Sequence, residues 1–152
     1  MRLYRIAKKA YATDLTGLGA KLYGGRWNHR GTALIYTSET RSLATLEFLV
    51  HVSLPYVPTG LSIATIEIPD HLVPEEMTPE SLPRNWHEHP SSSKSADIGT
   101  KWAKSNRSLL LRVPSAVVEK EFNVLMNPLH PDIVRVVLLE LEPFEMDERL
   151  YR

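Results

Sequence analysis

The chain has 152 residues, of which 43% are hydrophobic and 24% charged, a composition typical of a globular protein with one core. Its 18 Lys and Arg balance its 18 Asp and Glu, so the zero net charge excludes a broad basic surface for nucleic acid, although not a local basic cleft. The absence of cysteine excludes disulfides and thiolate metal sites and is compatible with a reducing cytoplasm.

The chain contains no apolar run close to the roughly 20 residues needed to cross a bilayer. Its first residues, MRLYRIAKK, lack the apolar core of a signal peptide. We also find no repeats and no low-complexity region. The sequence therefore predicts a cytoplasmic protein without membrane contact, built as a single domain over residues 1–152.

The first predicted element is a short strand at residues 3–6. Strand alternation points Arg5 away from its two neighbours. An inward Arg5 would help to hold an anionic ligand, whereas an outward Arg5 would be an ordinary edge residue. Residues 8–21 have no sustained hydrophobic period, and Gly17 and Gly19 predict a loop.

A Gly-Gly-Arg-Trp turn follows. Gly24 and Gly25 can adopt backbone angles closed to other residues and let a ligand approach the main chain. Arg26 adds a permanently charged, planar fork that suits phosphate or carboxylate, and Trp27 adds aromatic surface. The local pattern alone favours a simpler interpretation, a tight loop with a surface arginine and a core tryptophan.

Residues 33–37 predict a buried strand. Tyr36 lies near its end, where aromatic rings often line a cleft, although ordinary core packing also accounts for it. A helix is predicted over residues 42–52, with Ser38 or Thr40 as its N-cap.

Apolar side chains cover nearly the whole circumference of this helix, which predicts that it is the most buried helix of the fold. Glu47 lies on the same face as Leu43, Leu46 and Val50. An ionised carboxylate in that position needs a partner or a wet cleft. A structural ion pair with an arginine is one explanation, and a functional site is the other.

The second half of the chain alternates short apolar runs with Gly and Pro. His87 and His89 have no third ligand at a recognisable spacing, so a surface loop is favoured over a metal site. Ser115 follows a strand, where its hydroxyl can cap a turn and also serve function. The run at 134–141 is apolar on both faces and predicts a central strand ended by Pro143. The other predicted elements are a linker at 54–60, a loop at 73–90, an exposed turn at 91–95, a helix at 97–106, strands at 61–68, 109–113 and 122–126, and a charged tail at 145–152.

The run GGRWNHRGTALIYTSETRSLATLEFLVH, with the opening LYRI and the later VPSAVV and NVLMNPLHP, resembles the RES-domain toxins. These are the toxin halves of bacterial toxin–antitoxin pairs with Xre-like antitoxins. Arg26, Glu47 and Ser115 match, in order, the three residues that give the family its name. The resemblance extends from residue 2 to about residue 144.

The resemblance implies an α/β (α+β) fold akin to the ADP-ribosyltransferases, with a split mixed sheet around an NAD cleft. It implies a toxin that cleaves NAD at the nicotinamide–ribose bond by phosphorolysis or hydrolysis, which depletes cellular NAD and arrests growth. NAD is then a substrate, with no resident cofactor or metal, and inorganic phosphate is the co-substrate of phosphorolysis. The alternatives are ADP-ribosyl transfer to a host protein and a non-catalytic partner-binding module. A nucleic-acid-cleaving toxin is disfavoured by the zero net charge.

The residue types fit these implied roles. Arg26, assisted by Arg5, would anchor the pyrophosphate. The ring of Tyr36 would hold the cationic nicotinamide, and Glu47 would stabilise positive charge on the ribose. Ser115 would bind the nicotinamide amide or a phosphate. The expected catalytic residues are Arg26, Tyr36, Glu47 and Ser115, and the expected NAD-binding residues are Arg5, Gly25, Arg26, Tyr36 and Ser115.

A free NAD-consuming enzyme would harm its own cell, so the resemblance also implies a neutralising Xre-like antitoxin. We expect a hetero-oligomer in which the antitoxin inserts a segment into the cleft and supplies a group for Arg26. No direct contact with nucleic acid is expected from this chain.

Overall fold

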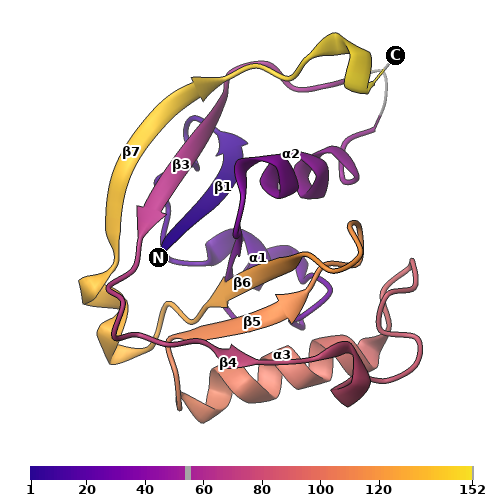
Figure 1. Cartoon of the computed structure of the whole chain (residues 1–152), viewed down its shortest axis with the longest axis vertical. Helices are drawn as coiled ribbons and strands as arrows, with labels where there is room; N and C mark the ends of the chain where they lie inside the picture. Colours follow the sequence, from indigo (N-terminus) through magenta and orange to yellow (C-terminus); the bar gives the residue numbers. More distant parts are fainter. Residues whose placement is uncertain (54–55, 152) are drawn as a thin grey trace.

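The protein is described here by a computed structural model, which covers residues 1–53 and 56–151. The described residues form a seven-stranded sheet in the order β4-β5-β6-β2-β1-β3-β7, and three α-helices accompany it (Figure 1). The β4–β5 pair is parallel and the other pairs are antiparallel, so the sheet is mixed, as predicted. The strands are β1 (Arg2–Lys8), β2 (Ile35–Ser38), β3 (Leu61–Glu67), β4 (Glu75–Glu76), β5 (Leu110–Pro114), β6 (Phe122–Met126) and β7 (Val137–Phe144).

The sheet is split between β1 and β2. Among the described residues these two strands are joined only by the pair Tyr4 and Ser38. In contrast, β1 pairs with β3 along its whole length, and β2 pairs with β6 along its whole length. The two halves therefore splay apart, with β7, β3 and β1 in one and β2, β6, β5 and β4 in the other (Figure 1).

The helices are α1 (Leu18–Tyr23), α2 (Arg41–Leu49) and α3 (Ser93–Ser105). Helix α2 packs on β1 and β2, where Ala44 meets Ile6 in a small apolar cluster. Helix α3 runs beside the β4–β5–β6 half, and Trp102 packs there with Leu111 and Leu125 (Figure 1). A third cluster, which includes Leu3, Ile35, Ile66, Val124 and Met126, joins the two halves of the sheet.

Helices α1 and α2 correct three predictions. Helix α2 buries only Leu43 and Ala44 within its span, whereas α3 buries six residues, so α2 is not the most buried helix. Its face near Glu47 lines a cavity, which explains the difference. It ends at Leu49 rather than residue 52, and of the two predicted caps Thr40 accepts from Leu43 N. Part of the loop predicted at 8–21 is helix α1, which the structure starts after Gly17.

Helix α3 begins at Ser93, four residues earlier than predicted, because Ser92 supplies an N-cap hydroxyl. The turn predicted to be exposed at 91–95 therefore ends inside the helix, and Ser95 is buried. The linker predicted at 54–60 begins at residues 54 and 55, which lie outside the described residues.

The strand predicted to be central is at the sheet edge. Among the strands that the structure describes, β7 pairs only with β3, and Val137, Leu139 and Leu141 are 37–50% exposed. It also begins later than predicted, because residues 131–135 form a 3₁₀ turn. Pro143 lies within β7 instead of ending it, which an edge strand tolerates. The apolar run therefore predicted that a strand forms here, but it did not predict which strands lie beside it in the sheet.

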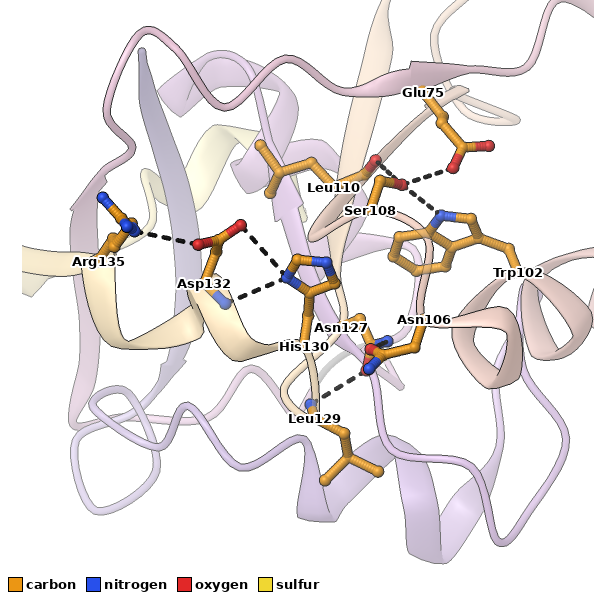
Figure 2. A network of polar contacts seen from close by, with 10 residues as sticks. All are labelled: Glu75, Trp102, Asn106, Ser108, Leu110, Asn127, Leu129, His130, Asp132 and Arg135. Atoms are coloured by element: carbon orange, nitrogen blue, oxygen red, sulfur yellow. Dashed lines mark hydrogen bonds and ion pairs between the residues drawn. The ribbon is translucent and has the colours of Figure 1, made fainter.

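A polar network fixes the end of the sheet that is remote from α2 (Figure 2). Ser108 Oγ accepts a hydrogen bond from Trp102 Nε1 at 2.9 Å and donates one to Glu75 at 2.7 Å. Asn127 Nδ2 donates to Ala103 O at 3.0 Å and to Asn106 Oδ1 at 3.1 Å. These contacts tie α3 to the ends of β4, β5 and β6.

None of the helices formed by the described residues has the length and apolar content required to span a bilayer. The same residues contain no group of three or more His, Cys, Asp or Glu arranged to hold a metal ion.

Candidate active site

A cavity of about 1170 Å³ opens between α2, the turn at 24–28 and the start of α3. It lies where the sheet is split, since Tyr4 and Ser38, the pair that joins the halves, both line it. Five of the six predicted site residues line this cavity as well: Arg5, Gly25, Arg26, Tyr36 and Glu47. The split sheet thus brings together side chains from β1, β2, α2 and the glycine turn.

The conformation and close contacts of the Gly-Gly turn require glycine at both positions. Gly24 has φ +72°, which glycine adopts without strain. A Cβ at Gly25 would lie 2.6 Å from the Tyr36 hydroxyl oxygen and 3.1 Å from Asn28 Oδ1. Both glycines are therefore required by the geometry, and the turn passes close to the cavity wall.

Tyr36 fastens this turn to β2. Its hydroxyl donates to Asn28 Oδ1 at 2.7 Å and accepts from the Trp27 N–H at 3.1 Å. Burial raises the pKa of the Tyr36 phenol, while the Trp27 amide and the Arg26 charge act in the opposite direction. The phenol therefore stays neutral and able to donate, and its ring lines the cavity.

Tyr36→Phe should destabilise the protein by about 1–3 kcal/mol, because it leaves Asn28 Oδ1 and the Trp27 N–H without their partner. Thermal unfolding would show this as a fall in Tm of roughly 2–4 °C per kcal/mol. Tyr4→Phe is the matched control, since Tyr4 lines the same cavity and the described residues include no hydrogen bond of its hydroxyl. Equal Tm values for both variants would contradict the role given to the Tyr36 hydroxyl.

Arg26 is partly buried rather than a free surface residue. Its Nη1 donates to Trp86 O at 2.7 Å and to Glu88 O at 2.9 Å, and Trp86 stacks on Trp27 at 6.3 Å between ring centroids. Burial lowers the pKa of Arg26, and the carboxylate of Glu47 raises it. Arg26 therefore anchors the loop that contains Trp86 through one nitrogen, while its charge acts on the cavity.

Glu47 does not form the structural ion pair that was one explanation for it. Within the described part of the chain, its carboxylate has no cation within ion-pair distance. Ser115 Oγ donates to its Oε1 at 2.7 Å, and Asn123 Nδ2 donates to the same oxygen at 2.5 Å. The alternative explanation remains, a carboxylate in a cleft, because Glu47 is partly exposed and lines the cavity.

Ser115 lies behind Glu47. It is 4% exposed, and besides donating to Glu47 it accepts from the N–H groups of Val117 and Val118 at 3.0 Å each. The hydroxyl thus combines the predicted turn role with a contact to the site. Direct contact between Ser115 and a ligand stays a prediction, and its position favours an effect through Glu47.

Arg5 lines the cavity from β1, and its Nη1 donates to the carbonyl of Asp14 at 2.5 Å. Burial lowers the pKa of Arg5, and the nearby Asp14 carboxylate raises it. This inward position fits the first of the two alternatives for Arg5, a second cation near the cleft.

Three residues of the site were not predicted from the sequence. Asn28 is 1% exposed, and its Nδ2 donates to the carbonyls of Ala20 and Thr32. Its Oδ1 accepts the hydrogen bond of the Tyr36 hydroxyl. Asn123 binds Glu47, and Trp86 stacks on Trp27. In the sequence, Asn28 stands out only by its place in the turn after the two glycines. Asn123 and Trp86 have no such local signal, because their roles depend on contacts between remote segments.

A split mixed sheet around a cleft of this kind defines an α+β protein with an ADP-ribosyltransferase-like fold. The fold is similar to a chain of the M. tuberculosis MbcT–MbcA toxin–antitoxin complex, with a TM-score of 0.74 and 18% identity over 99% of this chain and 86% of that chain. At this identity the likeness concerns the fold alone.

Residues 2–147 match the RES domain. A protein of Yersinia enterocolitica named "Toxin Res" is 42% identical over 99% of both chains. A protein of Sphingobium sp. named "Prs ADP-ribosylating toxin" is 39% identical over 99% of this chain and 95% of its own length. The chain therefore belongs to the RES-domain family of toxins.

Proposed function

We propose that this protein is the toxin of a toxin–antitoxin system and that it cleaves NAD at the nicotinamide–ribose bond. The observation that carries the proposal is the meeting of Arg26, Tyr36 and Glu47 around one cavity. A cation, an aromatic ring and a carboxylate are the groups that the anionic pyrophosphate, the cationic nicotinamide and the developing ribose cation require. The relative named as an ADP-ribosylating toxin supports it, since ADP-ribosylation from NAD breaks the same bond.

In the proposed reaction, the bond between ribose C1′ and the nicotinamide nitrogen breaks, and its electron pair leaves with neutral nicotinamide. Positive charge develops on C1′ and the ring oxygen, and the carboxylate of Glu47 stabilises it. An oxygen of water or inorganic phosphate then forms the new bond to C1′ and gives up a proton to solvent. The products are nicotinamide with ADP-ribose or ADP-ribose 1″-phosphate.

Arg26 supplies charge for the pyrophosphate while its Nη1 holds the carbonyls of Trp86 and Glu88. Arg5 is a second cation on the same cavity, and the open side of Gly25 lets the phosphates approach the main chain. The ring of Tyr36 forms a wall for nicotinamide. Ser115 supports Glu47 from behind.

The second candidate is transfer of ADP-ribose to a protein, which the name of the Sphingobium relative favours. The cleavage half-reaction is shared, and only the acceptor differs. A third candidate, a non-catalytic partner-binding module, would leave NAD intact.

Incubation of the purified chain with NAD tests these candidates together. We expect nicotinamide release, and product mass spectrometry separates ADP-ribose, its phosphate ester and a modified protein. Phosphate dependence identifies phosphorolysis, and label transferred from NAD to a lysate protein identifies a transferase. Unchanged NAD under all three conditions would refute the proposed activity.

The partner in this proposal is an antitoxin, as in the complex that contains the similar fold. We place the system in the bacterial cytoplasm, with the whole chain acting as one RES domain and an Xre-like antitoxin in a hetero-oligomer. An antitoxin segment in the cavity, with a group bound to Arg26, would block NAD. A complex as active as the free chain would count against this blocking mechanism.

Arg26→Lys should weaken NAD binding by about 10- to 100-fold although the charge is kept, because one ammonium cannot hold both the loop carbonyls and a phosphate fork. Calorimetry in a Glu47→Gln background measures binding without turnover. Arg84→Lys, an exposed arginine of the same loop, is the control and should bind NAD normally. Equal affinities of the two variants would remove Arg26 from pyrophosphate binding.

A further inference from the structure

A chain of hydrogen bonds connects β2 and β6 to the candidate carboxylate on α2. Ser38 Oγ donates to Asn123 Oδ1 at 2.6 Å, and Asn123 Nδ2 donates to Glu47 Oε1 at 2.5 Å. Ser38 and Asn123 are directly opposite each other in the β2–β6 ladder, so both side chains lie on the same face of the sheet. The chain therefore starts on rigid backbone and ends at Glu47.

The carboxylate of Glu47 determines which end of the Asn123 amide it meets, and Ser38 holds the opposite end. An ionised carboxylate only accepts hydrogen bonds, so it needs the NH₂ end of the amide. The hydroxyl of Ser38 donates to the oxygen end and holds the amide in that orientation. A flipped amide would place its oxygen against Glu47 Oε1 and lose that hydrogen bond, and the Ser38 hydroxyl would have to turn and accept from the NH₂ end instead of donating.

The two donors to Glu47 reach the same oxygen. Ser115 Oγ and Asn123 Nδ2 both donate to Oε1, and among the described residues no donor to Oε2 is present. Ser115 comes from the turn after β5 and Asn123 from β6, so Oε1 is fixed from two directions. Glu47 and Asn123 both line the cavity.

We propose that Asn123 is a positioning residue that, with Ser115, anchors Glu47 Oε1 and leaves Oε2 as the oxygen presented to the ribose. This inference rests on the proposed NAD cleavage. A glutamate side chain has three rotatable bonds, and a misplacement of about 1 Å can cost roughly 100-fold in rate. Two donors on one oxygen remove that freedom before substrate binds.

Asn123→Ala should lower kcat for nicotinamide release by about 10- to 100-fold, with KM for NAD within about threefold of its original value. Ser38→Ala should lower kcat less, because Nδ2 is retained and only its orientation is released. In a Glu47→Ala background the loss caused by Asn123→Ala should disappear, since there is no carboxylate left to position.

Asn127→Ala is the matched control. Asn127 follows the same strand and is buried. In the described structure its side chain bonds only α3 and its own loop, through Ala103 and through Asn106 and Leu129 (Figure 2). Its loss should lower Tm without lowering kcat of the folded fraction. A purely structural role of both asparagines would instead lower Tm in both variants and spare kcat in both.

Two results would overturn the inference. An unchanged kcat in Asn123→Ala would do so, and so would an undiminished loss in the Glu47→Ala background, which would make Asn123 a direct substrate contact. Crystal structures of the original protein and Asn123→Ala give a readout without turnover, and we expect the Glu47 carboxylate to move. If the original protein leaves NAD intact but Glu47 still moves, the proposed function fails and the positioning role stands.

Discussion

Glu47→Gln is expected to stop nicotinamide release while the protein stays folded. In the proposed reaction the carboxylate stabilises charge that exists only in the transition state, so turnover should fall by at least two to three orders of magnitude, on the order of 3–4 kcal/mol. NAD binding should weaken only modestly, because the ground state lacks most of that charge. Binding of the antitoxin should persist.

The hydrogen bonds of Glu47 explain why this variant should remain stable. Ser115 Oγ and Asn123 Nδ2 both donate to Oε1, and the glutamine side chain keeps an oxygen for them. The change weakens two charge-assisted bonds to neutral ones, a cost of about 1 kcal/mol. Glu47→Ala removes the oxygen as well, and should cost about 1–3 kcal/mol because both donors lose their acceptor.

Thermal unfolding and nicotinamide release, measured on the same preparations, separate the possibilities. Glu142→Gln is the control. It removes a surface carboxylate of β7 that pairs with Arg41, a residue of α2, the helix that also contains Glu47. Its effect on stability should be about 0–1 kcal/mol, and turnover should be unchanged. A stable Glu47→Gln variant with near-normal turnover would exclude Glu47 from the mechanism.

Glu47 could be singled out from the sequence because it violates a local rule. A carboxylate on an apolar helix face must find donors or water, and here it finds both, in Ser115, Asn123 and the cavity. This signal is local, because the residue and its unusual neighbours lie within one helix. The local pattern around Arg26 favoured a surface arginine in a tight loop, and the resemblance to the RES-domain toxins was needed to single it out.

The partners of these residues could not be predicted in the same way. Asn123 is 76 positions from Glu47, and Trp86 is 60 positions from Arg26. Their own surroundings look like ordinary strand and loop. Contacts of this kind arise only when the two halves of the sheet come together around the cavity.

Burial was also predicted unevenly. The apolar runs located β1, β2, β3, β5 and β6 within a few residues, because strand alternation is local. Whether an apolar face is covered depends on the neighbouring elements, which the run does not encode. For this reason β7 was expected at the centre and lies at the edge, and α2 was expected to be the most buried helix although α3 is.

Gly99 is the position at which helix α3 packs against the turn that contains Arg26 and Trp27. It lies in α3, on the side that faces the glycine turn, and a Cβ there would lie 1.8 Å from the Trp27 carbonyl oxygen and 2.8 Å from its carbon. Both contacts are with backbone, which cannot rotate away. Nothing in the sequence around Gly99 singles out this glycine, since glycine inside a helix usually only costs about 1 kcal/mol.

Gly99→Ala should therefore destabilise the protein by about 3 kcal/mol or more, at the upper end of overpacking effects, because α3 or the turn must move. The expected fall in Tm is about 6–12 °C. The near-UV circular dichroism of the Trp27–Trp86 stack should change as well, since Trp27 belongs to the displaced turn.

Gly19→Ala provides the matched control, because Gly19 lies in α1 and a Cβ there meets no atom within 4 Å. This change should leave Tm the same or raise it, because the higher helix propensity of alanine contributes up to about 1 kcal/mol of stability.

The Gly99→Ala variant should also bind NAD less well. Arg26 directly precedes Trp27, so movement of the turn should displace the Arg26 guanidinium from the carbonyls of the 86–88 segment. NAD binding should then fall in the folded fraction of Gly99→Ala, although Gly99 is not among the residues that line the cavity. Normal stability and normal NAD binding in this variant would mean that α3 and the turn do not meet as closely as the structure has them.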